Sequence, residues 1–277
     1  MSDPTLFALV LHLHPLAPAR LPATMGHQAH AAFLAAVRGA DPALAERLHA
    51  PEAVKPFTVS PLFGLPRARD GLVAMSPERT YRLRLTLLDS ILYQELMGRF
   101  LTGDQRLIRL GSVDFAINKV CATPQGDSEA GATSAAQLWE SARPPRSLAL
   151  RFRTLTAFNR TQGRDRRFLL FPEPPAVFDS LLRVWNTLDG PQFEKAPLRE
   201  YVAAHVVVAE YALRTRMWQY RHSRQVGFVG TVRYECRGYP EASRRQLAAL
   251  SALSFYSGVG YKTTQGMGQV RPVPDEG

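Results

Sequence analysis

Hydrophobic positions alternate with a period of two in several segments of the first half of the chain. Residues 5–14 and 80–88 show this period, which predicts strands because successive side chains of a strand point to opposite faces. In the second segment Leu83 and its odd-numbered neighbours are expected to face the core. Arg82, Arg84 and the following threonine are expected to face outward.

Between these strands the hydrophobic period lengthens to that of helices. The segment HQAHAAFLAAVRG predicts an alanine-rich helix that ends at its glycine. A second helix is predicted to begin with Asp41 as N-cap and Pro42 at the first helical position, and to run to about His49. The segment DSILYQELMGRFL predicts an amphipathic helix capped by Asp89 or Ser90.

The remaining segments complete a recognisable order of elements. VKPFTVSPLFG predicts a short strand between two prolines, and LIRLGSVDFAINKVCA predicts a further set of strands. The order strand–helix–strand–strand–helix–strand is typical of a ferredoxin-like domain. Residues 124–146 are small, polar and proline-containing, and are interpreted as a connection with one short helix.

The same order restarts after the connection. SLALRFRTLTAF predicts a strand, PAVFDSLLRVWNTL a helix, and RTRMWQYRH with QVGFVGTVRYECRG a hairpin. PEASRRQLAALSALSFYSG predicts the last helix and GQVRP the last strand. We therefore predict an α+β protein of two tandem ferredoxin-like (RRM-like, βαββαβ) domains, residues 1–123 and 147–277.

Composition favours a folded protein with a polyanionic partner. The 277 residues are 45% hydrophobic and 21% charged, with 34 Lys and Arg against 24 Asp and Glu and a net charge of +10. Only four of the 34 are lysines, and arginine binds phosphate bidentately and stacks on bases. An arginine-rich codon bias would give the same excess. The two cysteines predict neither a disulfide framework nor a zinc site, and the absence of an apolar membrane span or signal segment predicts a cytoplasmic protein without a membrane partner.

Residues 258–270, GVGYKTTQGMGQV, form a glycine-rich polar loop that suggests contact with an anion. A Walker A loop needs glycine before its lysine, but Tyr261 precedes Lys262. A dinucleotide-binding fingerprint needs a third glycine where Thr263 stands. A glycine helix cap explains one glycine but not four, so a phosphodiester chain is the expected ligand. The residues expected to contact RNA here are Gly258, Gly260, Lys262, Thr264, Gln265, Gly266 and Gly268.

The extended segment SFYSGVGYKTTQGMGQVR strongly resembles the C-terminal signature of the RAMP superfamily, and more specifically of the CRISPR-associated endoribonucleases that mature precursor CRISPR RNA, the sixth Cas family. HAAFLAAV followed by RLHA and VKPFTVSPLFG is similar to the N-terminal half of that family. LRFRTLTAFNR resembles its middle signature, with Leu155 in place of a usual proline. The resemblance covers nearly the whole chain. It implies CRISPR repeat RNA as partner and cleavage that uses no metal or other cofactor.

Cleavage of this kind uses the neighbouring 2′-hydroxyl as nucleophile and calls for a base and an acid, for which histidine is suited. His27 and His30 lie three residues apart on one predicted helix face, and the resemblance implies a catalytic histidine at the position of His30. His49 is expected in the last turn of the next helix, where the helix dipole favours a protonated ring. We assign His30 and His49 to acid–base work without deciding which is the base, with His27 as a third candidate and Lys55 as a stabiliser of charge.

The segment RMWQYRHSRQ interleaves cations and aromatic rings that suit RNA, although an edge hairpin with one solvated face would alternate in the same way. The candidates are Arg216, Trp218, Arg221 and Arg224, with His222 beside them. The alternative function is a non-catalytic RAMP subunit that binds guide RNA in a CRISPR effector complex. Subunits of such a complex, or a second copy of this chain, are therefore further candidate partners.

Overall fold

The computed structural model describes residues 3–50, 54–103, 106–160, 167–219 and 224–274, which fold into two compact units. The N-terminal unit contains residues 4–132 and, from much further along the chain, residues 264–266. The C-terminal unit contains residues 133–263 and 267–277 with the first three residues. Each unit is described below by itself.

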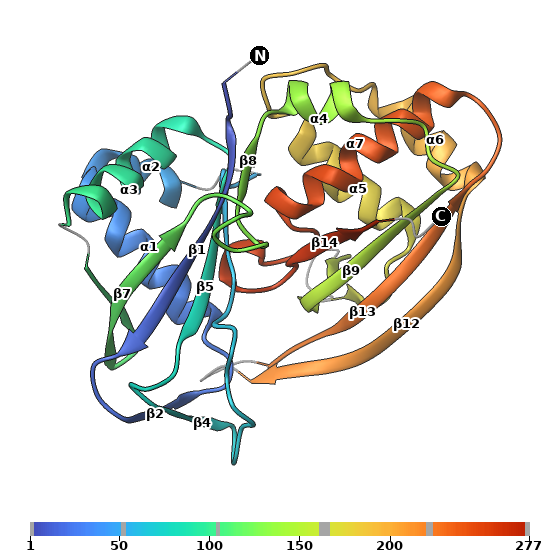
Figure 1. The fold of residues 1–277 in the computed structure, drawn as a ribbon. Helices are drawn as coiled ribbons and strands as arrows, with labels where there is room; N and C mark the ends of the chain where they lie inside the picture. The colour runs from blue at the N-terminus through green and yellow to red at the C-terminus, as the bar shows by residue number, and fades with distance from the viewer. Residues whose placement is uncertain (1–2, 51–53, 104–105, 161–166, 220–223, 275–277) are drawn as a thin grey trace. The chain divides into compact units, whose positions relative to one another are not determined.

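The N-terminal unit is built on one antiparallel sheet (Figure 1). Its elements in chain order are β1 (Leu6–Pro15), β2 (Ala19–Pro22), α1 (Gly26–Ala40), α2 (Pro42–His49), β3 (Phe57–Val59), β4 (Leu72–Met75), β5 (Tyr81–Leu87), α3 (Ser90–Thr102), β6 (Leu107–Leu110), β7 (Val113–Cys121) and β8 (Gly131–Thr133). The strand order β3-β5-β1-β7, extended by β6, is that of a ferredoxin-like domain, with β8 also paired to β1. The predicted fold of this half is confirmed.

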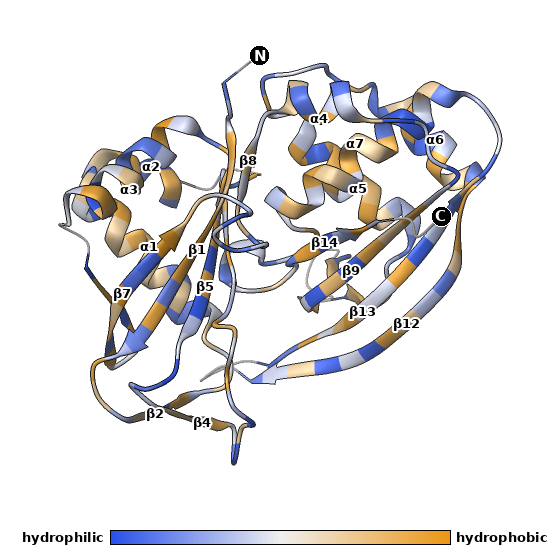
Figure 2. Ribbon diagram, in the orientation of Figure 1, coloured by the Kyte–Doolittle hydropathy of each residue, from blue (hydrophilic) through white to orange (hydrophobic). Residues whose placement is uncertain are grey.

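Local sequence signals explain where the helices of this unit begin. The Asp41 side chain accepts the backbone N–H groups of Ala43 and Leu44 at the start of α2. Asp89, rather than Ser90, caps α3 in the same way. One core is formed by the apolar sides of α1 and α3 together with the odd-numbered positions of β1 and β5. Figure 2 shows hydrophobic and hydrophilic residues alternating along these strands.

β2 pairs with β4, which comes after α1, α2 and β3 in the chain, in a small two-stranded sheet. One local expectation for this unit is wrong. Arg84 and Thr86 were expected to face outward, but their exposed fractions are 4% and 0%. The reason is that the chain after β7 folds back over this second face, where the Arg84 guanidinium donates to the carbonyl of Glu129.

The C-terminal unit repeats the topology. Its elements are α4 (Ala135–Ser141), β9 (Ser147–Thr156), β10 (Phe158–Asn159), β11 (Phe168–Leu169), α5 (Pro174–Trp185), α6 (Lys195–His205), β12 (Val206–Gln219), β13 (Arg224–Cys236), α7 (Glu241–Ser257) and β14 (Val270–Val273). The short 3₁₀ helix η1 (Thr263–Gln265) begins in this unit, and its last two residues belong to the N-terminal unit. The antiparallel order β12-β13-β9-β14 is again ferredoxin-like, which confirms the tandem arrangement. Trp185 and Phe178 of α5 and Tyr234 of β13 are buried in its core.

β12 and β13 form a long two-stranded ribbon at the edge of this sheet (Figure 1). Their antiparallel register runs from Val206 opposite Cys236 to Gln219 opposite Arg224. The hairpin was predicted, but its first strand begins eight residues earlier than the segment RTRMWQYRH. Among the described residues no helix is long and apolar enough to cross a membrane.

Candidate functional site

The candidate catalytic histidines lie at the start of α1 and the end of α2. Because α1 begins at Gly26, His27 and His30 occupy its first turns. His49 is the last residue of α2. His27 and His49 are exposed, whereas His30 is half-buried. α1 and α2 are consecutive and pack on each other. The start of α1 and the end of α2, which carry the three histidines, therefore belong to one region of the N-terminal unit.

His30 is fixed on two sides. Its Nδ1 atom lies 2.9 Å from the backbone carbonyl oxygen of Thr264. Its ring stacks on Phe57 of β3, with centroids 5.9 Å apart and planes 16° from parallel. Phe57 is itself stacked on Phe33 of α1 at 4.5 Å, so the surface under the histidine belongs to the core.

The electrostatic environment of His30 disfavours its protonated form. Burial lowers the pKa of His30, the hydrogen bond to Thr264 raises it, and the charges of His27, His49 and Lys55 lower it further. The net pKa lies below the ordinary value for histidine. The three other candidate residues therefore lie close enough to act on His30 through their charge, so the structure brings all four together.

Lys55 is held at the end of α2. Its Nζ atom donates to the carbonyl of Ala50, the residue that follows His49. Helix C-termini carry partial negative charge on their carbonyl groups, so an ammonium group stabilises this end of the helix. The same contact keeps a cation beside the histidines.

The glycine-rich loop runs from the end of α7 through η1 to β14. Its glycines all adopt positive φ angles, from 62° at Gly258 to 92° at Gly266. A side chain at Gly260 would place Cβ 2.6 Å from the carbonyl oxygen of Ala157, so the loop packs directly against its own unit. The space beside these glycines is thus occupied by backbone atoms of the protein itself.

The middle of the loop is more accessible than its two ends. The N–H groups of Val259, Tyr261 and Gly268 donate to carbonyl oxygens of the same unit. Gly258, Gly266 and Gly268 are buried, whereas residues 260–265, which include Lys262, Thr264 and Gln265, are half-exposed. The accessible part of the loop is therefore residues 260–265.

The β12–β13 ribbon carries the second group of residues that the sequence predicted as RNA contacts. Arg216 and Arg224 are exposed. Trp218 is half-buried and packs on a small cluster of Leu155, Ala157 and Met267, which covers part of its side chain. Arg221 and His222 lie outside the described residues.

Comparison with known protein families gives two matches that together span nearly the whole chain. Residues 5–140 match the Cas6 N-terminal domain, and residues 150–270 match the CRISPR-associated endoribonuclease Cas6. The chain belongs to the Cas6 family. This membership confirms the resemblance of the glycine-rich segment to the sixth Cas family.

Solved Cas6 structures agree along the whole length of the chain. The Cas6 (TTHB231) product complex is 31% identical with a TM-score of 0.83, covering 98% of this chain and 100% of that one. Thermus thermophilus Cas6 (TTHB231) is 32% identical with a TM-score of 0.74, covering 99% and 100%. A CRISPR-associated endoribonuclease Cas6 of Streptococcus thermophilus is 26% identical over 145 residues, which are 52% of this chain and 57% of the relative. The match thus spans little more than half of that curated relative.

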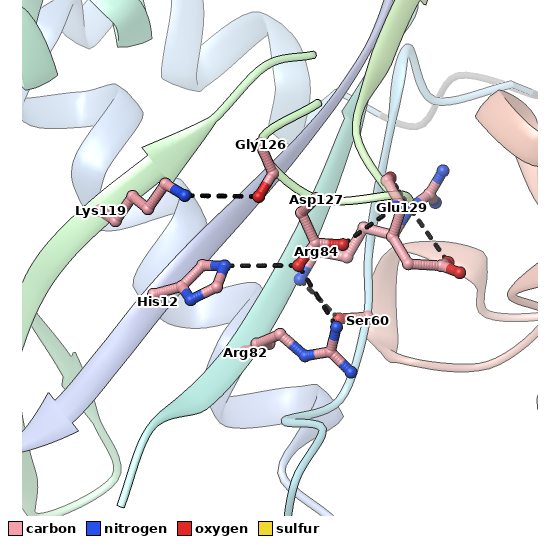
Figure 3. Close-up of polar contacts among 8 residues, drawn as sticks. All are labelled: His12, Ser60, Arg82, Arg84, Lys119, Gly126, Asp127 and Glu129. Carbon is pink, nitrogen blue, oxygen red and sulfur yellow. Dashed lines mark hydrogen bonds and ion pairs between the residues drawn. The ribbon is translucent and has the colours of Figure 1, made fainter. Parts of the chain in front are cut away.

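One feature of this Cas6 chain is a polar network on the second face of the N-terminal sheet (Figure 3). Asp127 lies in the segment that follows β7, and its Oδ2 atom is 3.3 Å from His12 Nε2 and 3.2 Å from Arg82 Nη1. Lys119 donates to the carbonyl of Gly126 in the same segment. The basic side chains on this face thus have partners within the chain.

The same face carries two further histidines, His12 and His14 of β1. Asp127 lies beside His12. His14 contacts the carbonyl of Pro77 at 3.1 Å and the hydroxyl of Thr80 at 3.0 Å. No sequence signal links Asp127 to a strand more than a hundred residues earlier.

Sequence reasoning also missed how the Cas6 loop contributes to the histidine site. Thr264 was predicted as an RNA contact through its polar side chain, but its backbone carbonyl is what meets His30. Gly26, at the first position of α1, was not singled out. A Cβ atom at this position would overlap the backbone of Gln265, so the missing side chain makes room for the loop.

Proposed function

We propose that this chain is an endoribonuclease that cleaves CRISPR repeat RNA in precursor transcripts and releases mature guide RNA without a metal ion. The 2′-hydroxyl of the nucleotide before the cut loses its proton to a histidine, and its oxygen attacks the adjacent phosphorus. The bond from phosphorus to the 5′-oxygen breaks, and that oxygen receives a proton from a second group. The products are a 2′,3′-cyclic phosphate and a 5′-hydroxyl.

The observation that carries this proposal is the arrangement around His30. A half-buried histidine with a lowered pKa is neutral near pH 7 and suits a proton acceptor. His49 and Lys55 supply an exposed ring and a cation nearby, which suit proton donation and stabilisation of the phosphorane. His27, one helical turn before His30, is assigned to positioning the phosphate.

RNA binding is assigned to two surfaces. In the loop, Lys262, Thr264 and Gln265 are half-exposed and suit the phosphodiester backbone. On the ribbon, Arg216 and Arg224 are exposed cations that suit phosphates or stacked bases. The glycines of the loop act indirectly, by giving the backbone the turns that place these side chains.

Cleavage of the cognate repeat RNA in EDTA tests the function. Wild type is expected to cut once per repeat, and His30→Ala and His49→Ala to cut 10²–10⁴-fold more slowly, roughly the range for loss of an acid or base. His14→Ala is the matched control, because His14 makes its contacts with Pro77 and Thr80 in the same unit. Equal rates for His30→Ala and His14→Ala would contradict the assignment.

The alternative is a guide-RNA-binding RAMP subunit that does not cut. It would share the glycine-rich loop, so the loop does not distinguish the two functions. Salt-sensitive binding of repeat RNA without cleavage by wild type would favour this alternative. An RNA with a 2′-deoxy nucleotide at the cut should bind but remain intact if the 2′-hydroxyl is the nucleophile.

A further inference from the structure

The contact between His30 and Thr264 determines which ring nitrogen carries a proton. A backbone carbonyl oxygen only accepts hydrogen bonds, so at 2.9 Å the Nδ1 atom of His30 must be the donor. In a neutral imidazole only one nitrogen carries a proton. The Nε2 atom of neutral His30 therefore keeps a lone pair and is able to accept a proton.

We propose that residues 264–266 of the glycine-rich loop position the catalytic histidine, with the Thr264 carbonyl fixing the tautomer and orientation of His30 so that Nε2 takes the proton of the 2′-hydroxyl. Thr264 is a positioning residue that acts through its backbone. The inference rests on the proposed function, since it assigns the base of that reaction. It also gives the loop a role besides contact with RNA.

Two glycines allow the loop to come this close to α1. A Cβ atom added at Gly26 would overlap the carbonyl oxygen of Gln265. A Cβ atom added at Gly266 would lie 2.9 Å from the Cα of Gly26 and 3.3 Å from the nitrogen of Pro61. Backbone thus packs directly on backbone beside the histidine, and the position of the Thr264 carbonyl depends on that approach.

Gly26 is explained by this approach and not by its own backbone. Its φ is not among the positive values, unlike that of Gly266 at 92°. Alanine is therefore compatible with the helix at position 26, and only the loop excludes it. A substitution at position 26 should therefore displace the Thr264 carbonyl without straining the backbone of α1.

The surroundings of His30 fit a base whose tautomer is fixed. The ring lies on Phe57, which supports it from the core side. Its burial and the nearby charges of His27, His49 and Lys55 lower the pKa of His30, which outweighs the opposite effect of the carbonyl. Burial, helped by the neighbouring charges, thus favours the neutral ring, while the carbonyl selects the nitrogen that carries the proton.

The test compares Gly26→Ala with Gly98→Ala on the full-length chain. Gly98 lies inside α3 of the same unit, and a Cβ atom there would meet nothing within 4 Å. Single-turnover cleavage of repeat RNA should fall on the order of 10²-fold in Gly26→Ala, as for a misplacement of about 1 Å, and remain at the wild-type rate in Gly98→Ala. Affinity for the uncleavable 2′-deoxy RNA, measured for both variants, shows how much of the loss comes from displaced RNA contacts of Thr264 and Gln265, because single-turnover rates at saturating enzyme do not depend on that affinity.

A spectroscopic measurement gives an answer that does not depend on activity. The 15N shifts of His30 in the wild-type protein, assigned with His30→Gln, distinguish a proton on Nδ1 from one on Nε2. We expect the Nδ1 tautomer in wild type and a mixture in Gly26→Ala. The rate of Gly26→Ala should also depend on pH with a shifted midpoint, which a purely structural loss of folded protein would not cause.

A conservative variant separates positioning from chemistry. His30→Asn keeps an N–H donor near the place of Nδ1 but has no counterpart of Nε2. It should melt close to wild type, retain RNA binding and lose cleavage.

The outcomes separate this inference from the proposed function. Absence of cleavage by wild type would overturn the proposed function itself. Cleavage by wild type with equal rates for Gly26→Ala and Gly98→Ala, or an Nε2 proton on His30 in wild type, would overturn the positioning role alone.

Discussion

Replacing Asp127 by asparagine tests the network that covers the second face of the N-terminal sheet. The carboxylate is almost fully buried, with 6% of its side chain exposed, and contacts His12 at 3.3 Å and Arg82 at 3.2 Å. Its other oxygen accepts the backbone N–H of Glu129 at 2.9 Å. Asparagine has the same shape and still offers one oxygen to Glu129, but it presents an amide N–H group or a neutral oxygen to His12 and Arg82.

The expected loss follows from the exposure of the partners. Hydrogen bonds to charged groups contribute about 1.5–3 kcal/mol when they are well shielded. The Arg82 side chain is 40% exposed, so water screens its half of the pair. We therefore expect Asp127→Asn to lower the free energy of unfolding by about 1–2 kcal/mol at neutral pH, at the lower end of that range.

The loss should depend on pH in a defined direction. Burial raises the pKa of Asp127, but hydrogen bonds from Glu129 and Arg82 and the charges of Arg82 and His12 lower it, and the net pKa is below the ordinary value. A carboxyl whose folded pKa is depressed stabilises the protein fully above its unfolded pKa of about 3.9. That stabilisation disappears as the pH falls through the folded pKa, so wild type and Asp127→Asn should converge in acid.

Urea unfolding followed by tryptophan fluorescence and circular dichroism, at neutral pH and below about pH 4, measures both effects. Asp114→Asn is the control, because its ion pair with Arg109 in the same unit is 3.9 Å long and the two side chains are 44% and 68% exposed, so water screens the pair. It should change stability by less than about 0.5 kcal/mol. A loss for Asp127→Asn no larger than this, or one that persists unchanged in acid, would refute the reasoning.

Three further predictions concern the C-terminal half of the chain. Gly268→Ala would drive a Cβ atom into the carbonyl of Val259 at a φ of 69°, so its melting temperature should fall well below that of the control Gly71→Ala, which has a φ of 74° but nothing within 4 Å; equal melting temperatures would contradict this packing. Tyr234→Phe removes a buried hydroxyl that donates to a carbonyl at 2.8 Å and should cost about 1–2 kcal/mol in urea unfolding, and no loss would mean that the bond is dispensable. Lys262→Gln should reduce the slope of log K for RNA against log salt by about 1, whereas an unchanged slope would remove this lysine from the phosphate path.

Features encoded within a few residues were predictable from the sequence. Asp41 and Pro42 signal the start of α2, and the alternation of residues 80–88 signals β5, because each depends on local backbone chemistry. The order of such segments was enough for the ferredoxin-like topology of both halves. The clustering of histidines also followed, since His27 and His30 share a helix turn and the next helix follows directly.

Features that depend on distant pairing were not predictable in this way. The burial of Arg84 depends on a carbonyl 45 residues later in the chain. β2 is a strand only because β4, with which it pairs, lies beside it. The Thr264 carbonyl is 234 residues from His30. Every residue has a backbone carbonyl, so the residue type at position 264 does not indicate this contact. Gly26, whose missing side chain makes room for the loop, was not singled out in the sequence.

The same separation along the chain has a consequence for synthesis on the ribosome. The strands of the N-terminal sheet are all translated by residue 133, so that sheet can assemble early. The carbonyl that meets His30 is added 234 residues after the histidine, a delay on the order of 10–50 s at ordinary elongation rates. During that interval the Thr264 carbonyl is missing, so the ring of His30 in the nascent chain could adopt either tautomer. The contact that fixes the ring of His30 can therefore form only after residue 264 has been translated.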